Sequence, residues 1–244
     1  MIGPPPKVIG HRGAALSAPE NTLAGFRRAR ALAAPWVELD VRLAKGDLPV
    51  VIHDDTLDRT TDGTGRVSDC PPETLGTLDA GSWFGKRFAG ERVPTMAEAA
   101  ALIASLGLGL NIEVKAAAGR EADTARLAVA ATRQAWPADR APPLMSSFSR
   151  PALQAAREAA PDWPRALLVD GLPADWHQAA LGLGCTVICA DHRRLDERQV
   201  ARVRAAGLGL LAWTVNDPGR ARQLFDWGVD GVFSDAPDRI LTVA

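Results

Sequence analysis

The sequence has few cysteines, and none of them are in a paired spacing. The three thiols are Cys70, Cys185 and Cys189, an odd number without any Cys-x-x-Cys. This pattern argues against a disulfide framework and favours a protein of a reducing compartment. The N-terminal stretch MIGPPPKVIGHRG also lacks a basic segment followed by an apolar one, so no secretory leader is expected. A cytoplasmic location is predicted.

Long apolar runs and an excess of one charge are missing as well. No uninterrupted apolar run approaches the roughly 18 residues of a membrane span, so no stable membrane insertion is expected. Lys and Arg number 28 against 29 Asp and Glu, so the chain has no overall field to attract nucleic acid. Neither GxxxxGK[ST] nor GxGxxG occurs. An anionic substrate must therefore be held by a local site of another kind.

The sequence does have a regular alternation of short β-like runs with Ala- and Arg-rich helical stretches. Hydrophobic residues make up 47% of the 244 residues, which is enough for a sizeable core. Such alternation is typical of a parallel sheet covered by helices. The β-like runs lie at 7–11, 36–43, 48–53, 108–115, 143–148, 165–170, 186–191, 209–215 and 229–235.

A closed (β/α)8 barrel needs eight parallel strands, so one of these nine runs must lie outside it. The tetrapeptide AKGD that precedes the run 48–53 is too short for a parallel crossover, so this run is predicted to turn back antiparallel against 36–43. We therefore predict an α/β fold, a single TIM-barrel domain over residues 1–244. A small Gly- and Pro-rich insertion at 54–94 is expected to form a lid or a substrate wall.

Three carboxylates stand inside apolar runs, near the strand ends where barrels carry their sites. Glu38 and Asp40 share one face of their strand because side chains alternate, and Glu113 lies near the end of another strand. Carboxylates suit Mg²⁺ or Ca²⁺, and two acids on one face would repel each other without a cation. We predict one divalent metal here and leave its identity open. The alternative is a pair of structural salt bridges to Arg12, Arg42 or Lys115.

His11 and His53 each end an apolar run, and each is followed by a charged residue. Folding the predicted hairpin about its turn places His53 roughly opposite Glu38, beside the carboxylates. Imidazole titrates near neutral pH, which favours an acid/base pair over two satisfied core histidines. The sequence does not determine which of the two is the acid, and His177 and His192 are given no role.

Arg12 and Lys115 are the cations expected beside the acids. An arginine clamp and a mobile lysine charge suit a phosphate, and charge balance for the acids is compatible with that role. Phe148 and Trp213 stand at predicted strand ends, where they either line a substrate pocket or belong to the core. The motif PENT is explained by a helix start that is capped by its Asn or its Thr.

Several motifs occur together, in one order, along almost the whole chain. They are GHRG (10–13), PENT (19–22), ELDV (38–41), HDDTLDRTTDGTG (53–65), GSWF (81–84), IEVK (112–115), SSF (146–148) and AWTVN (212–216). As a set they resemble the glycerophosphodiester phosphodiesterase family. The resemblance implies a TIM barrel with a small insertion and a divalent metal. It also implies hydrolysis of glycerophosphodiesters, such as glycerophosphocholine or glycerophosphoethanolamine, to glycerol 3-phosphate and an alcohol.

Carried over by position, the resemblance makes His11 and His53 the acid/base pair and places Arg12 and Lys115 near the phosphate. The metal ligands it implies are Glu38, Asp40 and Glu113. A small-molecule glycerophosphodiester is then the expected partner. Two alternatives are a phospholipase that acts on lysolipid headgroups and a non-catalytic sensor that binds phosphodiesters. The headgroup, the attacking group (water or the substrate's own glycerol hydroxyl) and the oligomeric state are not predicted.

Overall fold

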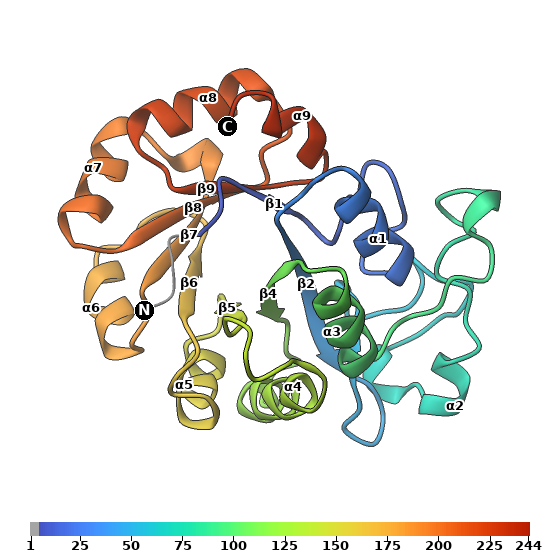
Figure 1. Cartoon of the computed structure of the whole chain (residues 1–244). Coiled ribbons are helices and arrows are strands. Elements are labelled where there is room, and N and C mark those ends of the chain that lie inside the picture. The colour runs from blue at the N-terminus through green and yellow to red at the C-terminus, as the bar shows by residue number, and fades with distance from the viewer. Residues whose placement is uncertain (1–4) are drawn as a thin grey trace.

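The computed structural model describes residues 5–244, in which eight parallel strands close into a ring with helices around it (Figure 1). Strand β1 pairs with both β2 and β9, which closes the ring. The predicted (β/α)8 barrel is therefore confirmed. The ring contains β1 (Val8–Gly10), β2 (Trp36–Leu43), β4 (Gly109–Val114), β5 (Leu144–Ser147), β6 (Arg165–Val169), β7 (Val187–Asp191), β8 (Gly209–Trp213) and β9 (Gly231–Ser234).

The ninth strand, β3 (Pro49–Val51), lies outside the ring and runs antiparallel to β2. The reversed hairpin predicted from the short AKGD connection is confirmed. Its register sets Val51 opposite Val41, and the Ile52 N–H donates to the Asp40 carbonyl. Two residues beyond Val51, His53 therefore falls beside position 39, one residue from the predicted pairing with Glu38. The small offset still brings the imidazole to the mouth of the ring.

The helices surround the strands, and several of them begin at a residue whose side chain caps the first turn, among them the Thr of the PENT motif. The Thr22 side chain accepts from the Gly25 N–H at the start of α1, while Asp217 and Pro218 open α8. Gly228 ends α8 with a left-handed φ of 100°, a conformation that glycine adopts without a Cβ clash. The helices are α1 (Leu23–Ala31), α3 (Met96–Ser105), α4 (Glu121–Ala135), α5 (Arg150–Ala159), α6 (Trp176–Gly182), α7 (Glu197–Ala205), α8 (Pro218–Trp227) and α9 (Pro237–Leu241).

Successive side chains of each strand point alternately out of the barrel and into it. The outward side chains form an apolar layer under the helices, whereas the interior contains both apolar and polar side chains. Val37, Leu39 and Val41 of β2 pack outward with the residues of the covering helices. A separate apolar cluster, to which Ile9 and Leu211 belong, fills part of the interior. Buried polar side chains also lie on the ring strands, among them Glu38 and Asp40 of β2, Asn111 and Glu113 of β4, and Ser146 of β5. A barrel built for packing alone would not bury these groups.

The segment 54–94 separates the β2–β3 hairpin from α3 and packs around its own small apolar cluster. Leu57, Val67, Leu75 and Val93 belong to that cluster. The segment contains α2 (Pro72–Leu75) and two single 3₁₀ turns, and Figure 1 shows it projecting beside α1. Arg87 donates to the Ser17 carbonyl, and the Ala24 N–H donates to Glu91, so the segment contacts the loop that follows β1.

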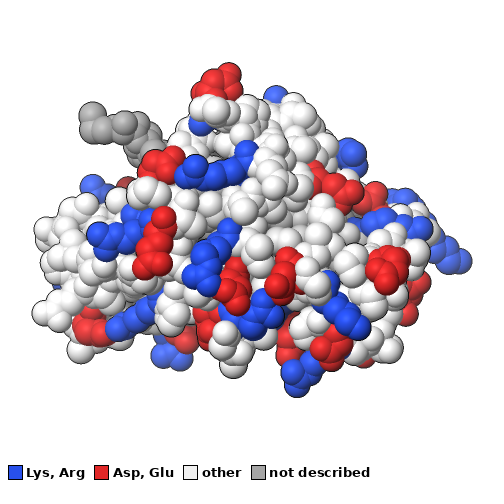
Figure 2. Space-filling view, turned by 90° about the horizontal axis from the view of Figure 1, so that it is seen from below, with Lys and Arg blue, Asp and Glu red and all other residues white. Residues whose placement is uncertain are grey.

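Charges of both signs are interleaved on the face of the molecule that Figure 2 shows, with no broad patch of either sign there. This distribution agrees with the balanced composition of the chain. Within residues 5–244, none of the helices combines the length and the apolar character needed to cross a bilayer.

Candidate active site

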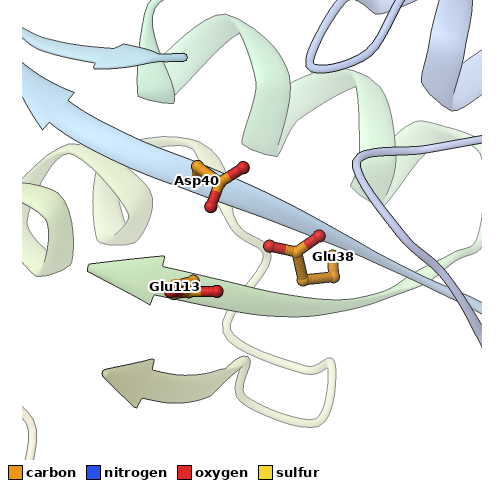
Figure 3. A group of neighbouring side chains, drawn as sticks. All are labelled: Glu38, Asp40 and Glu113. Carbon is orange, nitrogen blue, oxygen red and sulfur yellow. The ribbon is translucent and has the colours of Figure 1, made fainter. Parts of the chain in front are cut away.

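The three predicted metal ligands meet inside the barrel because β2 and β4 are parallel neighbours. Their register sets Asp40 beside Glu113 and Glu38 beside Asn111. Glu38, Asp40 and Glu113 each offer a carboxylate oxygen, and these oxygens lie within 4.8 Å of one another (Figure 3). All three side chains are buried. The structure thus brings the predicted acids into one cluster, which we call the acidic triad.

Backbone and amide donors hold two members of the acidic triad in place. The Asn21 amide donates to Asp40 Oδ2 over 2.8 Å, and its oxygen accepts from the Asp40 N–H over 3.2 Å. The backbone N–H of Arg12, whose φ is a left-handed 50°, donates to Glu38 Oε2 over 2.8 Å. Within the described residues, Glu38 Oε1 and Asp40 Oδ1 remain without a hydrogen-bond donor. Buried oxygens without a donor are costly, so these two call for a cation.

Two cations already contact the triad. Lys115 Nζ lies 2.5 Å from Glu113 Oε1 and 3.6 Å from Asp40 Oδ1, and Arg12 Nε lies 3.2 Å from Asp40 Oδ2. These three contacts are salt bridges to two of the cations, Arg12 and Lys115, that the sequence offers as the alternative to a metal. Arg42 makes no such contact and instead donates to the His53 carbonyl. Two cations against three carboxylates leave the triad with excess negative charge.

Burial and this excess negative charge raise the pKa of two of the three acids. Burial and repulsion from Asp40 raise the pKa of Glu38 to about 8, and the same two causes raise the pKa of Glu113. Burial would also raise the pKa of Asp40, but Arg12 and Lys115 lower it below its usual value. Hard oxygen ligands, two oxygens without donors and a carboxyl that retains its proton at neutral pH together fit a divalent cation.

Metal-free protein should lose stability as the pH rises from about 5 to about 8, because Glu38 binds its proton up to about pH 8 only when folded. Between these pH values the folded state still holds a proton on Glu38 that the unfolded state has already lost. The free energy of unfolding therefore falls as the pH rises. Thermal unfolding in a chelator should show this decline, and Glu38→Gln should reduce it. Equal declines in the two proteins would contradict the assignment.

His11 is held by a carboxylate at the end of the last strand. Its Nδ1 lies 2.6 Å from Asp235 Oδ1, and Asp235 Oδ2 accepts from the Asn216 amide over 2.7 Å. Burial would lower the pKa of His11, but the hydrogen bond to Asp235 and the charge of Glu38 raise it above its ordinary value. With Nδ1 on the carboxylate, Nε2 is the nitrogen left for a substrate.

His53 is held in the same way by its neighbour in the chain. Its Nδ1 lies 2.7 Å from Asp54 Oδ1. Burial lowers the pKa of His53 below its ordinary value, and the Arg12 and Lys115 charges act in the same direction against Asp40 and Asp54. The two histidines therefore have similar partners but pKa values shifted in opposite directions.

The two histidines share one cavity of about 250 Å³ with Glu38 and Glu113 of the acidic triad. Phe148, which is 45% exposed, and Trp213 form an edge-to-face pair there with ring centroids 5.7 Å apart. Asp40 alone among the nine predicted site residues is not part of the wall. The predicted residues that line the cavity are His11, Arg12, Glu38, His53, Glu113, Lys115, Phe148 and Trp213.

Several side chains that support the site are given no role by the sequence. Asp54 and Asp235 hold the histidines, and Asn216 and Arg59 hold these aspartates in turn. Asn21 orients Asp40, while its neighbour in the PENT motif is the helix cap. The signals for these residues are their positions: Asp54 and Arg59 lie in the motif HDDTLDRTTDGTG, Asn216 ends the motif AWTVN, Asp235 follows the last strand, and Asn21 belongs to PENT.

Comparisons with known proteins agree with this geometry. Residues 11–239 match the model of the glycerophosphoryl diester phosphodiesterase family. The glycerophosphodiester phosphodiesterase of Caldanaerobacter subterraneus subsp. tengcongensis is 35% identical over 237 residues, which cover 97% of this chain and 96% of the relative.

Among solved structures, a phosphodiesterase of Oleispira antarctica in complex with the product sn-glycerol-3-phosphate is 41% identical, with a TM-score of 0.95. The match covers 98% of this chain and 96% of that chain. A glycerophosphodiester phosphodiesterase from Agrobacterium tumefaciens is 30% identical, with a TM-score of 0.80, and the match covers 98% of this chain and all of that one. The chain therefore belongs to the glycerophosphoryl diester phosphodiesterase family, as its motifs predict, and is an enzyme.

Proposed function

We propose that this enzyme hydrolyses small glycerophosphodiesters, such as glycerophosphocholine or glycerophosphoethanolamine, to glycerol 3-phosphate and an alcohol. The observation that carries the proposal is the cavity that His11 and His53, each paired with an aspartate, line together with Glu38 and Glu113 of the buried acidic triad. The Oleispira relative of nearly identical fold, which binds sn-glycerol-3-phosphate, supports the choice of product.

Glu38, Asp40 and Glu113 would hold one divalent cation, Mg²⁺ or Ca²⁺. When bound, the cation would supply positive charge for the phosphodiester oxygens and for the charge that develops on them. Arg12 and Lys115 line the same cavity and would add a guanidinium and an ammonium contact to the phosphate. Both also contact the acids of the triad, so each would lie beside a phosphate that meets the cation.

The opposite pKa shifts of the two histidines assign their roles. His11, with its raised pKa, keeps a proton near neutral pH and donates it from Nε2 to the leaving alcohol. His53, with its lowered pKa, is neutral and removes a proton from the attacking hydroxyl. Attack by water gives glycerol 3-phosphate directly. Attack by the glycerol hydroxyl of the substrate releases the alcohol and gives a cyclic phosphate, which water must then open to glycerol 3-phosphate. Each aspartate keeps its imidazole in the tautomer that presents Nε2.

The aromatic pair and the insertion would bound the substrate. Phe148 and Trp213 offer apolar faces to the glycerol or the headgroup, and Lys115 Nζ lies 5.7 Å from the Phe148 ring centroid. Segment 54–94 begins directly after His53 and contacts the loop after β1 and the start of α1. None of residues 54–94 lines the cavity itself, so the segment would bound the substrate only beyond the cavity mouth. A cytoplasmic location and the absence of a nucleic-acid partner stay predictions from composition.

A panel of glycerophosphodiesters tests the proposal. Purified enzyme with added magnesium or calcium should release glycerol 3-phosphate from water-soluble diesters, detected with a coupled dehydrogenase. Micellar lysolipid should be turned over more slowly, because the cavity of about 250 Å³ holds a headgroup and not an acyl chain. Faster turnover of lysolipid would favour the phospholipase alternative. Substrate binding without any release would favour the sensor.

A further inference from the structure

The two histidine–aspartate pairs differ in what holds the aspartate. Asp235 accepts from the neutral amide of Asn216, and within residues 5–244 no lysine or arginine is hydrogen-bonded to the carboxylate that holds His11. Asp54 accepts from a cation, Arg59 of the insertion. A guanidinium on the far side of a carboxylate cancels much of the charge that the imidazole experiences.

The Arg59 guanidinium forms bidentate hydrogen bonds with two carboxylates. Its Nε and Nη2 donate to Asp54 Oδ2 and Oδ1 over 2.6 and 3.0 Å. Its Nη1 and Nη2 donate to Glu20 Oε2 and Oε1, both over 2.8 Å. Glu20 also accepts from Arg12 Nη1 over 2.8 Å. A continuous chain of charge-assisted hydrogen bonds therefore joins His53 to Arg12 and so to the acidic triad.

We propose that Arg59 is a positioning residue of the insertion, which fixes the Asp54–His53 pair and cancels the Asp54 charge so that His53 stays neutral and serves as the base. The inference rests on the hydrolytic function proposed above, which it deepens. It adds a contribution from Arg59, made through Asp54, to the burial and the Arg12 and Lys115 charges that already lower the pKa of His53. It also gives segment 54–94 a catalytic purpose beyond that of a wall.

The surroundings of His53 are consistent with this role. The charged groups facing it are Asp40 from β2, Arg12 after β1, Lys115 after β4 and the adjacent Asp54. Other charged or titratable groups near it are Glu38, Glu113 and His11 in the shared cavity, and Arg42 on its carbonyl. The hydrogen bonds from Arg59 hold the pKa of Asp54 well below its usual range, so the carboxylate stays ionised beside the ring.

Exposure of the Arg59 side chain, at 44%, would make an ordinary ion pair weak. Its two partners are much less exposed, at 11% for Glu20 and 26% for Asp54, and both contacts are bidentate. A planar fork with two bidentate partners has little freedom to reorient. Arg59 therefore fixes the Asp54 rotamer as well as its effective charge.

The test is the titration of His53, followed by NMR of the imidazole in the magnesium-loaded enzyme, together with the pH profile of kcat/KM. In Arg59→Gln the pKa of His53 should rise by about half a unit to one unit. The acidic limb of the profile should move by the same amount, with kcat/KM about 3- to 10-fold lower near pH 6 and recovering near pH 8. In Arg59→Lys the charge remains but the fork is lost, so kcat should fall while the titration stays near wild type.

Arg66→Gln is the matched control, because Arg66 is an exposed arginine of the same segment that makes no ion pair among the described residues. It should leave both the titration and the profile unchanged. An unchanged His53 pKa in Arg59→Gln would overturn the proposal, and so would wild-type kcat in Arg59→Lys, which remains informative if the Gln variant does not fold. The NMR titration needs no turnover, so it tests Arg59 even if the enzyme proves inactive on glycerophosphodiesters.

Discussion

His11→Ala is expected to lower turnover of glycerophosphocholine by about 10²–10⁴-fold while leaving hydrolysis of a nitrophenyl phosphodiester of glycerol far less affected. Choline is a poor leaving group that needs a proton as the P–O bond breaks, whereas nitrophenolate leaves without one. The raised pKa of His11, set by its hydrogen bond to Asp235 against the effect of burial, makes it the donor of that proton. Steady-state rates on the two substrates measure the difference directly.

His53→Ala provides the contrast. A general base acts on the attacking hydroxyl and not on the leaving group, so both substrates should lose a similar factor of about 10²–10⁴. The pH profile of the wild type should reflect the same two roles. Activity should fall at low pH because His53 gains a proton, and at high pH because His11 loses one. If the nitrophenyl ester rescues His53→Ala instead of His11→Ala, the two roles are reversed. Near-wild-type rates in both variants would remove the pair from the reaction.

Much of the barrel could be predicted because its strands are short, apolar and separated by helical stretches. The short AKGD connection excludes a parallel crossover. With nine apolar runs, the length of this connection therefore predicts eight ring strands and one reversed strand, as the structure has them. The acidic triad follows from strand periodicity, since Glu38 and Asp40 share a face and the β4 neighbour carries Glu113.

The supporting network could not be predicted in this way. Asn216 and Asp235 come from two different strand ends, and Arg59 reaches Glu20 across 39 residues of chain. No local period relates such pairs, because their approach depends on how loops cross the mouth of the barrel. The same limit applied to Arg42, which the sequence offers as a partner of the acids but which donates to a backbone carbonyl.

Replacing a single acid of the triad should abolish both metal binding and turnover. Asp40→Asn and Glu113→Gln each remove a charged oxygen ligand but keep the shape of the side chain, so we expect hydrolysis to fall by more than about 10³-fold. Chelation of the wild-type enzyme should have the same effect and should be reversed by added metal. Titration calorimetry with Mg²⁺ and Ca²⁺ would measure the binding and identify the preferred ion.

Asp191→Asn is the matched control, because Asp191 is also a buried acid at the end of a ring strand but pairs with Arg193 and lies outside the cavity wall. It should bind metal and turn over substrate as the wild type does. Metal binding to the wild type should also release a proton near pH 7, because Glu38 holds one there until a cation replaces it. Full activity in a chelator, or unchanged metal affinity in Asp40→Asn, would show that the three carboxylates are balanced by Arg12 and Lys115 alone.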